Sequence, residues 1–389
     1  MTRIRLLILA ATAFLTGCAS LPRPNPHSAA IRVTFDTDRI TSVKTRGVGI
    51  DDPVRIASIS KLFVSIGVLR LAEAGTLQLD TDVSHWLGWR LRNPNFPDVP
   101  ITLRLLLSHR SSLKDDIDYA IPLGTTLQHV LADPKAWDRQ HAPGTFFRYG
   151  NINHPVIAAV MEKATGERFD RLMARLVFEP LRIDACFNWT TCSDAAVGRA
   201  VVLRDEKGAV LRDDLKGVRP ACPVLSPDPA CDLTRYPLGS NGALFSPQGG
   251  VRISAAGLAR VGQLLLRGGE GMLGHESVRM MIGPEWVFDG GNGDTENGFW
   301  CAYGLAVQTL AASPACKNDP VGDGVERVGH SGDAYGLRSG LWYDLEAGNG
   351  TAYFVTQVPN GQKGRRSAYS AAEEELVATS PLASPADGH

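Results

Sequence analysis

Residues 55–69 read RIASISKLFVSIGVL, a polar Ser-Ile-Ser-Lys opening followed by a run that is apolar on nearly every side. Such a run predicts a helix that is buried all round. Ser58 and Lys61 lie three residues apart, so a helix places the hydroxyl and the amine on one face. A lysine desolvated there has a lowered pKa and can take the proton of a serine nucleophile. The alternative is structural: Ser58 caps the helix and Lys61 extends to solvent.

The same spacing occurs a second time, in SSLK, where Ser111 precedes Lys114 by three residues. DDID follows this second copy, and no apolar helix is present there to bury the lysine. The desolvation argument therefore fails, and we expect Ser111 to be a loop residue. Two copies also show that the motif is too short to identify a nucleophile by itself.

The composition of the chain is that of an ordinary globular protein. It has 389 residues, 21% charged and 44% hydrophobic, which is enough for a sizeable core and two domains. Forty basic residues against 41 acidic residues give a formal charge of -1, without a long block of one sign. Electrostatics therefore gives no reason to expect nucleic acid as a partner, and we expect a small molecule.

The N-terminal residues MTRIRLLILAATAFLTGCAS predict an export signal, because two arginines precede an apolar stretch too short to span a bilayer. The ending Leu-Thr-Gly-Cys resembles a bacterial lipobox, which implies a signal peptide over residues 1–17 and a lipid on Cys18. Ala19 is unlike the usual inner-membrane retention signal, so we expect a periplasmic protein anchored to the outer membrane. The alternative is an ordinary signal peptide cut near Ala19. No later segment reaches the roughly 18 apolar residues of a membrane helix.

Six further cysteines form an even set, which suggests disulfides in an exported chain. The neighbours along the sequence pair as Cys186 with Cys192, Cys222 with Cys231, and Cys301 with Cys316. Neighbourhood alone does not establish this connectivity. A metal site is the competing interpretation, but no Cys-x-x-Cys or His-x-x-x-His spacing supports it.

Strand signals lie near both ends of the chain, with helical and loop-like patterns between them. Residues 31–46 alternate and turn, residues 248–269 carry apolar residues at helical spacing, and strand character returns from residue 299. A last helix is expected over AAEEELVA. We therefore expect an α+β protein with a discontinuous α/β domain over residues 31–79 and 245–379 and an inserted, mostly α-helical domain over residues 80–244. A linker over residues 18–30 and a flexible tail over residues 380–389 complete the chain.

Two further motifs favour the first Ser-x-x-Lys copy. FFRYGNINH supplies Tyr149 and Asn151, and RVGHSGDAYG supplies His330, Ser331 and Gly332 ahead of a strand. With these motifs in this order, the chain resembles the serine β-lactamase and penicillin-binding superfamily, especially its branch of class C β-lactamases, DD-peptidases and esterases. LLSHRSSL and GGVRISAAGLARVGQLLLRGG also resemble segments of that branch.

The resemblance implies a β-lactamase/transpeptidase-like fold, an α/β sandwich in which helices flank an antiparallel sheet, with an inserted α-rich domain. It implies Ser58 as the nucleophile and Lys61 as the base or proton relay. Tyr149 would be a second general base, its phenol kept partly ionised, and Asn151 would orient Lys61 and the substrate carbonyl.

The third motif is implied to bind the substrate, through His330 and Ser331. Gly332 would let the strand approach the acyl group, and the amides of Ser58 and Asp333 would form the oxyanion hole. Neither a metal nor a cofactor is implied.

The His-Ser-Gly sequence departs from the Lys-Thr-Gly of β-lactamases. Because histidine is mostly neutral at pH 7, a permanent cation for a substrate carboxylate is missing at position 330. We therefore expect a lipid-anchored serine hydrolase that acts on small esters, amides or D-amino-acid peptides, with β-lactam hydrolysis less favoured. The alternative is a non-catalytic penicillin-binding-like module that binds peptidoglycan fragments or partner proteins. An α/β-hydrolase would need a Gly-x-Ser-x-Gly elbow, which the sequence lacks.

Overall fold

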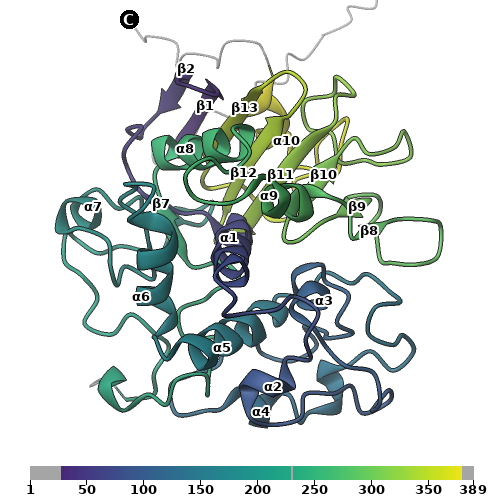
Figure 1. Cartoon of the computed structure of the whole chain (residues 1–389). Coiled ribbons are helices and arrows are strands. Elements are labelled where there is room, and N and C mark those ends of the chain that lie inside the picture. The colour runs from purple at the N-terminus through teal and green to yellow at the C-terminus, as the bar shows by residue number, and fades with distance from the viewer. Residues whose placement is uncertain (1–27, 229–230, 379–389) are drawn as a thin grey trace, which may run out of the picture.

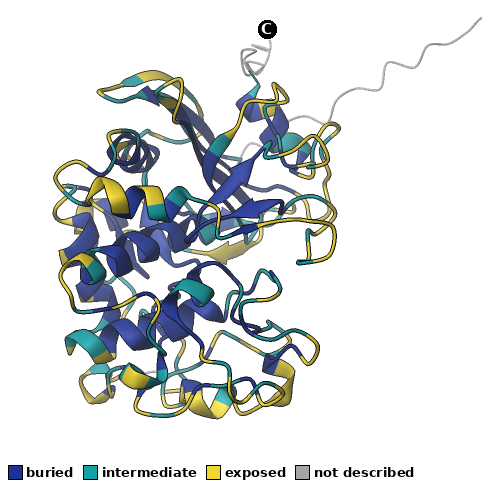
Figure 2. Cartoon of the chain, turned by 45° about the vertical axis from the view of Figure 1, so that its right-hand side comes forward, coloured by how far each residue is buried: buried dark blue, intermediate teal, exposed yellow. Residues whose placement is uncertain are grey.

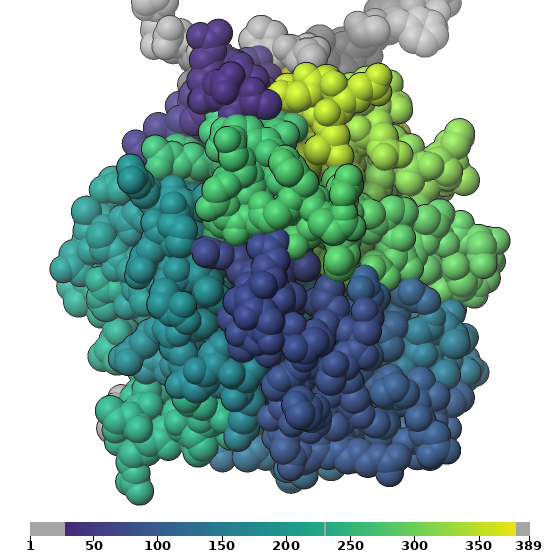
Figure 3. Space-filling model, in the orientation of Figure 1, coloured from purple at the N-terminus to yellow at the C-terminus, as the bar shows by residue number. Residues whose placement is uncertain are grey.

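The computed structural model describes residues 28–228 and 231–378 and is built around one antiparallel sheet. Its eight strands follow the order β2-β1-β13-β12-β11-β10-β9-β8. They are β1 (Ala30–Asp36), β2 (Ile40–Arg46), β8 (Trp286–Val287), β9 (Ala302–Tyr303), β10 (Gln308–Leu310), β11 (Arg327–Ala334), β12 (Leu337–Asp344) and β13 (Asn349–Val355). The pairing of β1 with β13 brings the two ends of the described chain together, as the adjacent purple and yellow surfaces of Figure 3 show.

Helices cover both faces of this sheet, as expected from the alternation of the strands. Along β1, the side chains of Ile31, Val33 and Phe35 pack into one core with α8 (Ala255–Leu266). Ala30 packs into a second core that contains residues of α10 (Ala371–Val377). Successive side chains of a strand point to opposite faces, so one strand serves both layers. The expected antiparallel sheet flanked by helices is confirmed, and so is the last helix.

The long helix α1 (Ser60–Glu73) runs through the middle of the molecule (Figure 1). Eleven of its fourteen residues are buried, because it lies between the sheet and the helices of the inserted segment. A small sheet in the order β3-β7-β4 holds the start of this helix, with β3 (Val54–Arg55), β7 (Val251–Ile253) and β4 (Cys186–Phe187). Figure 2 shows buried residues on both sides of this junction, and one core cluster spans the two parts.

The segment over residues 80–244 is less helical than expected. Its helices are α2 (Ser84–Leu87), α3 (Leu103–Leu107), α4 (Leu127–Val130), α5 (Asn153–Thr165), α6 (Phe169–Met173) and α7 (Asp194–Gly198), with single turns at Pro134–Ala136, Ala174–Phe178 and Leu233–Arg235. Within the described part of this segment only α5 is longer than two turns, and β4 and the hairpin β5 (Leu203–Arg204) and β6 (Val210–Arg212) are extended. Glycines stop several helices: Gly166, with φ of 70°, ends α5 in the left-handed region.

Three disulfides join Cys186 with Cys192, Cys222 with Cys231, and Cys301 with Cys316, as expected from the sequence. The remaining helix is α9 (His275–Ile282). No helix in residues 28–228 or 231–378 has the length and apolar character needed to cross a bilayer. The predicted signal peptide, Cys18, most of the linker and the C-terminal tail lie outside the described residues.

Candidate active site

Ser58 lies in a strained turn, η1 (Ala57–Ile59), that connects β3 to α1. Ala57 has φ of 49°, a left-handed conformation that a residue with a side chain rarely adopts. The Ser339 hydroxyl of β12 donates to the Ile56 carbonyl at 2.9 Å and holds the turn against the sheet. A Cβ at Gly332 would stand 2.3 Å from that same carbonyl oxygen. Gly332 therefore makes room for the turn that carries Ser58.

Lys61 points into the protein and reaches the hydroxyl of Ser58. The residue is 0% exposed, and its Nζ lies 2.9 Å from the Ser58 Oγ, the Asn151 Oδ1 and the Gln248 carbonyl oxygen. Burial lowers the pKa of Lys61 to about 7, although the negative charge of Asp115 acts to raise it. The alternative of a capping serine and a solvent-reaching lysine does not fit, because α1 has no side-chain cap and Lys61 is fully enclosed.

The three partners of Lys61 suit a neutral amine. A neutral amine donates two hydrogen bonds and accepts one, and here two of the three partners, the Asn151 side chain and the Gln248 main chain, offer carbonyl oxygens. The third partner is the Ser58 hydroxyl, which accepts a hydrogen bond from Nζ. In a neutral amine this bond can reverse, so that the hydroxyl donates its proton to the Nζ lone pair. The geometry thus fits a base that takes the serine proton at neutral pH.

Asp115 fixes Asn151 in this position, and sequence reasoning missed it. One carboxylate oxygen accepts the backbone N–H of Asn151 at 2.7 Å and its Nδ2 at 2.9 Å, while the other accepts the Ile152 N–H at 2.9 Å. The amide nitrogen of Asn151 is thereby held by Asp115, and its oxygen is left for Lys61. Asp115 lies 36 residues before Asn151 in a loop without a periodic pattern, so only the tertiary fold reveals the contact. The contribution of Gln248 is a backbone carbonyl, for which a sequence carries no signal.

Tyr149 stands beside Ser58 as a neutral phenol. Its ring stacks on Trp300, with centroids 4.4 Å apart and planes 14° apart, and the Lys61 Nζ lies 4.9 Å from the ring centroid. Burial raises the pKa of Tyr149 far above its ordinary value, and a hydrogen bond with Ser58 offsets this only in part. Burial therefore acts against the expected partly ionised phenol. A neutral phenol placed here is suited to donate a proton.

His330 is buried and turned away from the candidate site, contrary to expectation. It is 0% exposed, and its Nδ1 lies 2.6 Å from the Ser331 carbonyl oxygen, so Nδ1 carries the proton and donates. Nε2 then accepts from the Tyr303 hydroxyl at 2.8 Å. Burial, assisted by the charge of Lys61, lowers the pKa of His330 to about 3. His330 is neutral at every physiological pH and has no free donor for a substrate carboxylate.

Two cavities meet at the candidate nucleophile. One, of about 380 Å³, is lined by Tyr149, Trp300 and Ser331. The other, of about 870 Å³, is lined by residues of β3, the β5–β6 hairpin and the loop after β11. Ser58, Asn151 and Asp333 line both cavities. A substrate bound at Ser58 therefore has room on two sides.

The second Ser-x-x-Lys copy is structural, as expected. Ser111 lies in a loop, is 1% exposed, and donates its hydroxyl to the Asn153 Oδ1. Lys114 forms an ion pair with Asp116. Across the described residues, no group of three or more histidine, cysteine or acidic side chains is arranged to hold a metal ion.

Comparison with known proteins adds a family and a fold. The family model described as Beta-lactamase matches residues 32–376. Over 155 residues the chain is 30% identical to Esterase EstB of Burkholderia gladioli, a stretch of 35% of this chain and 38% of the esterase. It is 28% identical over 131 residues to Protein flp of Staphylococcus aureus, covering 33% of this chain and 26% of that protein. The matches thus span well under half the length of these curated relatives.

Solved structures share the fold at low sequence identity. A D-stereospecific amidohydrolase from Streptomyces sp. superposes with a TM-score of 0.61 at 19% identity, covering 89% of this chain and 92% of the other. The D-amino acid amidase of Ochrobactrum anthropi gives a TM-score of 0.62 at 19% identity, over 90% and 91% of the two chains. An octameric penicillin-binding protein homologue from Pyrococcus abyssi gives a TM-score of 0.63 at 19% identity, covering 90% of this chain and 72% of the other.

Proposed function

The chain belongs to the Beta-lactamase family and is a serine hydrolase, and we propose that it cleaves small esters or amides through an acyl-enzyme on Ser58. The observation that carries this proposal is the position of Lys61. A fully buried amine with a pKa of about 7 lies 2.9 Å from the hydroxyl that it must deprotonate. Nucleophile and base are therefore paired in the folded protein before any substrate binds.

The proposed acylation uses groups that the structure places around Ser58. The Ser58 proton passes to the Lys61 Nζ while the Oγ attacks the substrate carbonyl carbon. The amides of Ser58 and Asp333 would bind the resulting oxyanion, an interaction worth about 100- to 1000-fold in rate per donor in other enzymes. The Tyr149 phenol then protonates the leaving group as the bond to the carbonyl carbon breaks, and the proton held by Lys61 restores the phenol. Water attacks the acyl-enzyme by the reverse of these transfers.

The relatives support esters and amides as the substrate class. An esterase is among the sequence relatives, and amide-hydrolysing enzymes share the fold. We place D-amino-acid peptides within this class and regard β-lactam hydrolysis as less favoured, because His330 supplies no cation. We also propose that the chain is exported to the periplasm and lipidated at Cys18. Three disulfides support export, since such bonds form in oxidising compartments.

Labelling with a fluorophosphonate, followed by mass spectrometry, tests the proposal. We expect one modified residue, Ser58, and turnover of a 4-nitrophenyl ester that Ser58→Ala abolishes. Ser111→Ala is the matched control, because it removes a hydroxyl from the same motif but outside the site, and it should keep most of the activity. A protein that is neither labelled nor active, yet binds peptidoglycan fragments, would be the non-catalytic module instead.

A further inference from the structure

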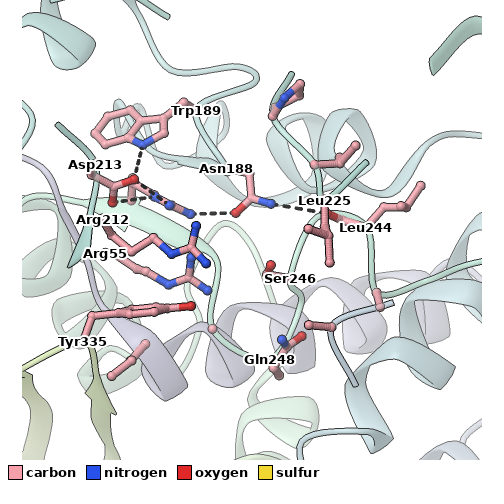
Figure 4. A pocket seen from close by; sticks show the side chains of 18 of the residues that line it. Arg55, Asn188, Trp189, Arg212, Asp213, Leu225, Leu244, Ser246, Gln248 and Tyr335 are labelled. Atoms are coloured by element: carbon pink, nitrogen blue, oxygen red, sulfur yellow. Dashed lines mark hydrogen bonds and ion pairs between the residues drawn. The ribbon is translucent and has the colours of Figure 1, made fainter. Parts of the chain in front are cut away.

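The larger cavity beside Ser58 contains an arginine subsite that the proposed chemistry does not use. We define this subsite as Arg55, Arg212 and Tyr335. Arg55 ends β3, three residues before Ser58, and Arg212 ends β6 of the hairpin. Both guanidinium groups lie over the Tyr335 ring, at 5.1 Å for Arg55 and 4.9 Å for Arg212 (Figure 4). All three side chains and Ser58 line the same cavity.

Arg55 is a buried cation whose guanidinium forms no hydrogen bond or ion pair within the described residues. The residue is 9% exposed, and its Nε is buried without a hydrogen-bond partner. The guanidinium lies over the aromatic face of Tyr335. Burial lowers the pKa of Arg55 to about 10, with Arg252 acting in the same direction and Tyr335 and Asp213 acting against it, so the group stays charged at neutral pH. A buried charge without a partner is costly, which indicates a site that is completed by a bound anion.

The neighbouring Arg252 shows what a satisfied arginine looks like in this cavity. Its Nε and Nη2 lie 3.2 and 2.8 Å from the two oxygens of Asp213, and its Nη1 donates to the Asn188 Oδ1 at 2.7 Å. The Trp189 indole also donates to Asp213, at 2.9 Å. Asp213 thus bonds to Arg252 and Trp189 and not to Arg55, although its negative charge still acts on Arg55 (Figure 4).

The other carboxylates that line the cavity belong to Asp118, Asp214 and Asp333, and within the described residues none of them forms an ion pair with Arg55 or Arg212. Asp333 forms an ion pair with Arg338. Asp118 accepts the Ala120 backbone N–H, and Asp214 is exposed. Within the described residues, Arg55 and Arg212 therefore place two guanidinium groups without an ion-pair partner around one aromatic ring.

The position of Tyr149 assigns the subsite to one part of the substrate. A proton donor must reach the leaving-group atom, and Tyr149 lines the smaller cavity but not the larger one. The leaving group therefore lies in the smaller cavity, and the acyl group extends from Ser58 into the larger one. We propose that Arg55 and Arg212 bind a carboxylate at the far end of the acyl group, so that the enzyme prefers anionic acyl substrates. This inference rests on the proposed function.

The guanidinium group is well suited to this task, since its planar donors match the two oxygens of a carboxylate. In this proposal the arginines of the larger cavity select the anionic acyl group, although position 330 lacks the cation that the family motif would place there. One hydrogen bond to a charged group corresponds to about 10- to 100-fold in kcat/KM when the transition state retains it.

The test compares two 4-nitrophenyl esters with the same adipate chain. One, 4-nitrophenyl hydrogen adipate, is anionic, and the other, methyl 4-nitrophenyl adipate, is neutral. We expect the wild type to favour the anionic ester in kcat/KM, and to lose this preference as salt is added. Arg212→Gln and Arg55→Gln should each lower the ratio of anionic to neutral kcat/KM by about 10- to 100-fold. Arg204→Gln is the control, because Arg204 lies on the same hairpin, does not line the cavity, and donates to the Gly208 carbonyl. This control should keep the wild-type ratio.

The possible outcomes separate the two proposals. If the wild type hydrolyses neither ester, the proposed function fails and the subsite inference fails with it. If both esters are hydrolysed but neither arginine variant changes the ratio, the inference is overturned while the proposed function stands. Arg212 is exposed on its hairpin, so Arg212→Gln decides the question even if the buried Arg55 variant does not fold.

Discussion

The Nζ of Lys61 lies 2.9 Å from the Oγ of Ser58, and the described residues place no ion-pair partner on that amine. The contacts of Nζ are a hydroxyl and two carbonyl oxygens. Burial favours the uncharged form of an amine, which is the form that a general base needs. The fold and the chemistry are thus coupled at Lys61, because the core that buries α1 also lowers the pKa of this lysine.

The first prediction concerns the pH dependence of acylation. Since Lys61 must be neutral to act and its pKa is about 7, kcat/KM for a neutral ester should rise as pH increases through about 7 and then level. The measurement is a pH profile between 5.5 and 9 with methyl 4-nitrophenyl adipate. A profile with its midpoint near 10 would mean that Lys61 keeps an ordinary pKa.

Lys61→Met should abolish activity but change stability in a pH-dependent way. The pKa of Lys61 is lowered in the folded protein. Between pH values of about 7 and 10.5 the unfolded chain therefore binds one proton more than the folded chain, and wild-type stability rises with pH. Methionine carries no charge, so its free energy of unfolding should lack this rise. Urea denaturation of both proteins at pH 7 and pH 9.5 measures the difference. Parallel changes in the two proteins would show that Lys61 does not titrate in that window.

Asp115 is predicted to be a positioning residue. Asp115→Asn should lower kcat by about 10- to 100-fold, because one carboxylate bonds three donors of the turn that carries Asn151. The negative charge of Asp115 also raises the pKa of Lys61, so the variant's pH profile should move to lower pH. Asp116→Asn is the matched control. Asp116 is the next residue after Asp115, but it forms an ion pair with Lys114. A loss of activity with an unmoved profile would leave Asp115 with only a structural role.

Tyr149→Phe tests the proton donor. Removal of the phenol should lower kcat by about 100- to 10,000-fold, the usual range for general acid catalysis. Because the pKa of Tyr149 is raised, the wild type should show no tyrosinate absorbance from this residue at pH 8. A tyrosinate band at pH 8 that disappears in Tyr149→Phe would restore the expectation of an ionised phenol.

Local patterns were enough to predict the sheet, the buried helix and the Ser58–Lys61 pair. Alternation in residues 31–35 and apolar positions in residues 60–71 report burial directly, and a spacing of three fixes two side chains on one face. The three disulfides also join neighbours in sequence. The structure bears out these features because each leaves a pattern within a short stretch of sequence, although β1 itself pairs with the distant β13.

The features that sequence reasoning missed depend on contacts between distant segments. Asp115 meets Asn151 across 36 residues, and the helical content of residues 80–244 was overestimated because apolar runs there pack as loops. The direction of His330 was also unpredictable, since it depends on the Tyr303 hydroxyl of a separate strand. A motif gives the residue at a position, but the packing around it decides which way the side chain turns.

The last prediction follows from that burial of His330. Because Nδ1 and Nε2 are both engaged and the ring is 0% exposed, His330→Lys should not create a carboxylate site. It should instead place an unpaired ammonium near Lys61 and cost about 3–5 kcal/mol of stability. His330→Gln keeps one donor and one acceptor, and should retain the fold and the preference between the anionic and neutral adipate esters.

The pH dependence of stability gives an independent measure. The pKa of His330 is about 3 in the folded protein, below the ordinary value near 6.5. Between these two pH values the unfolded chain therefore binds one proton more than the folded chain. Stability is therefore lost as pH falls through this window, by up to about 1.4 kcal/mol per pH unit for this residue. His109 and His154, whose pKa values burial also lowers, contribute in the same direction. Urea denaturation at pH 7.5, 6 and 5 should show a smaller loss for His330→Gln than for the wild type. Equal losses, together with an ester preference that follows the charge at position 330, would mean that His330 faces the substrate after all.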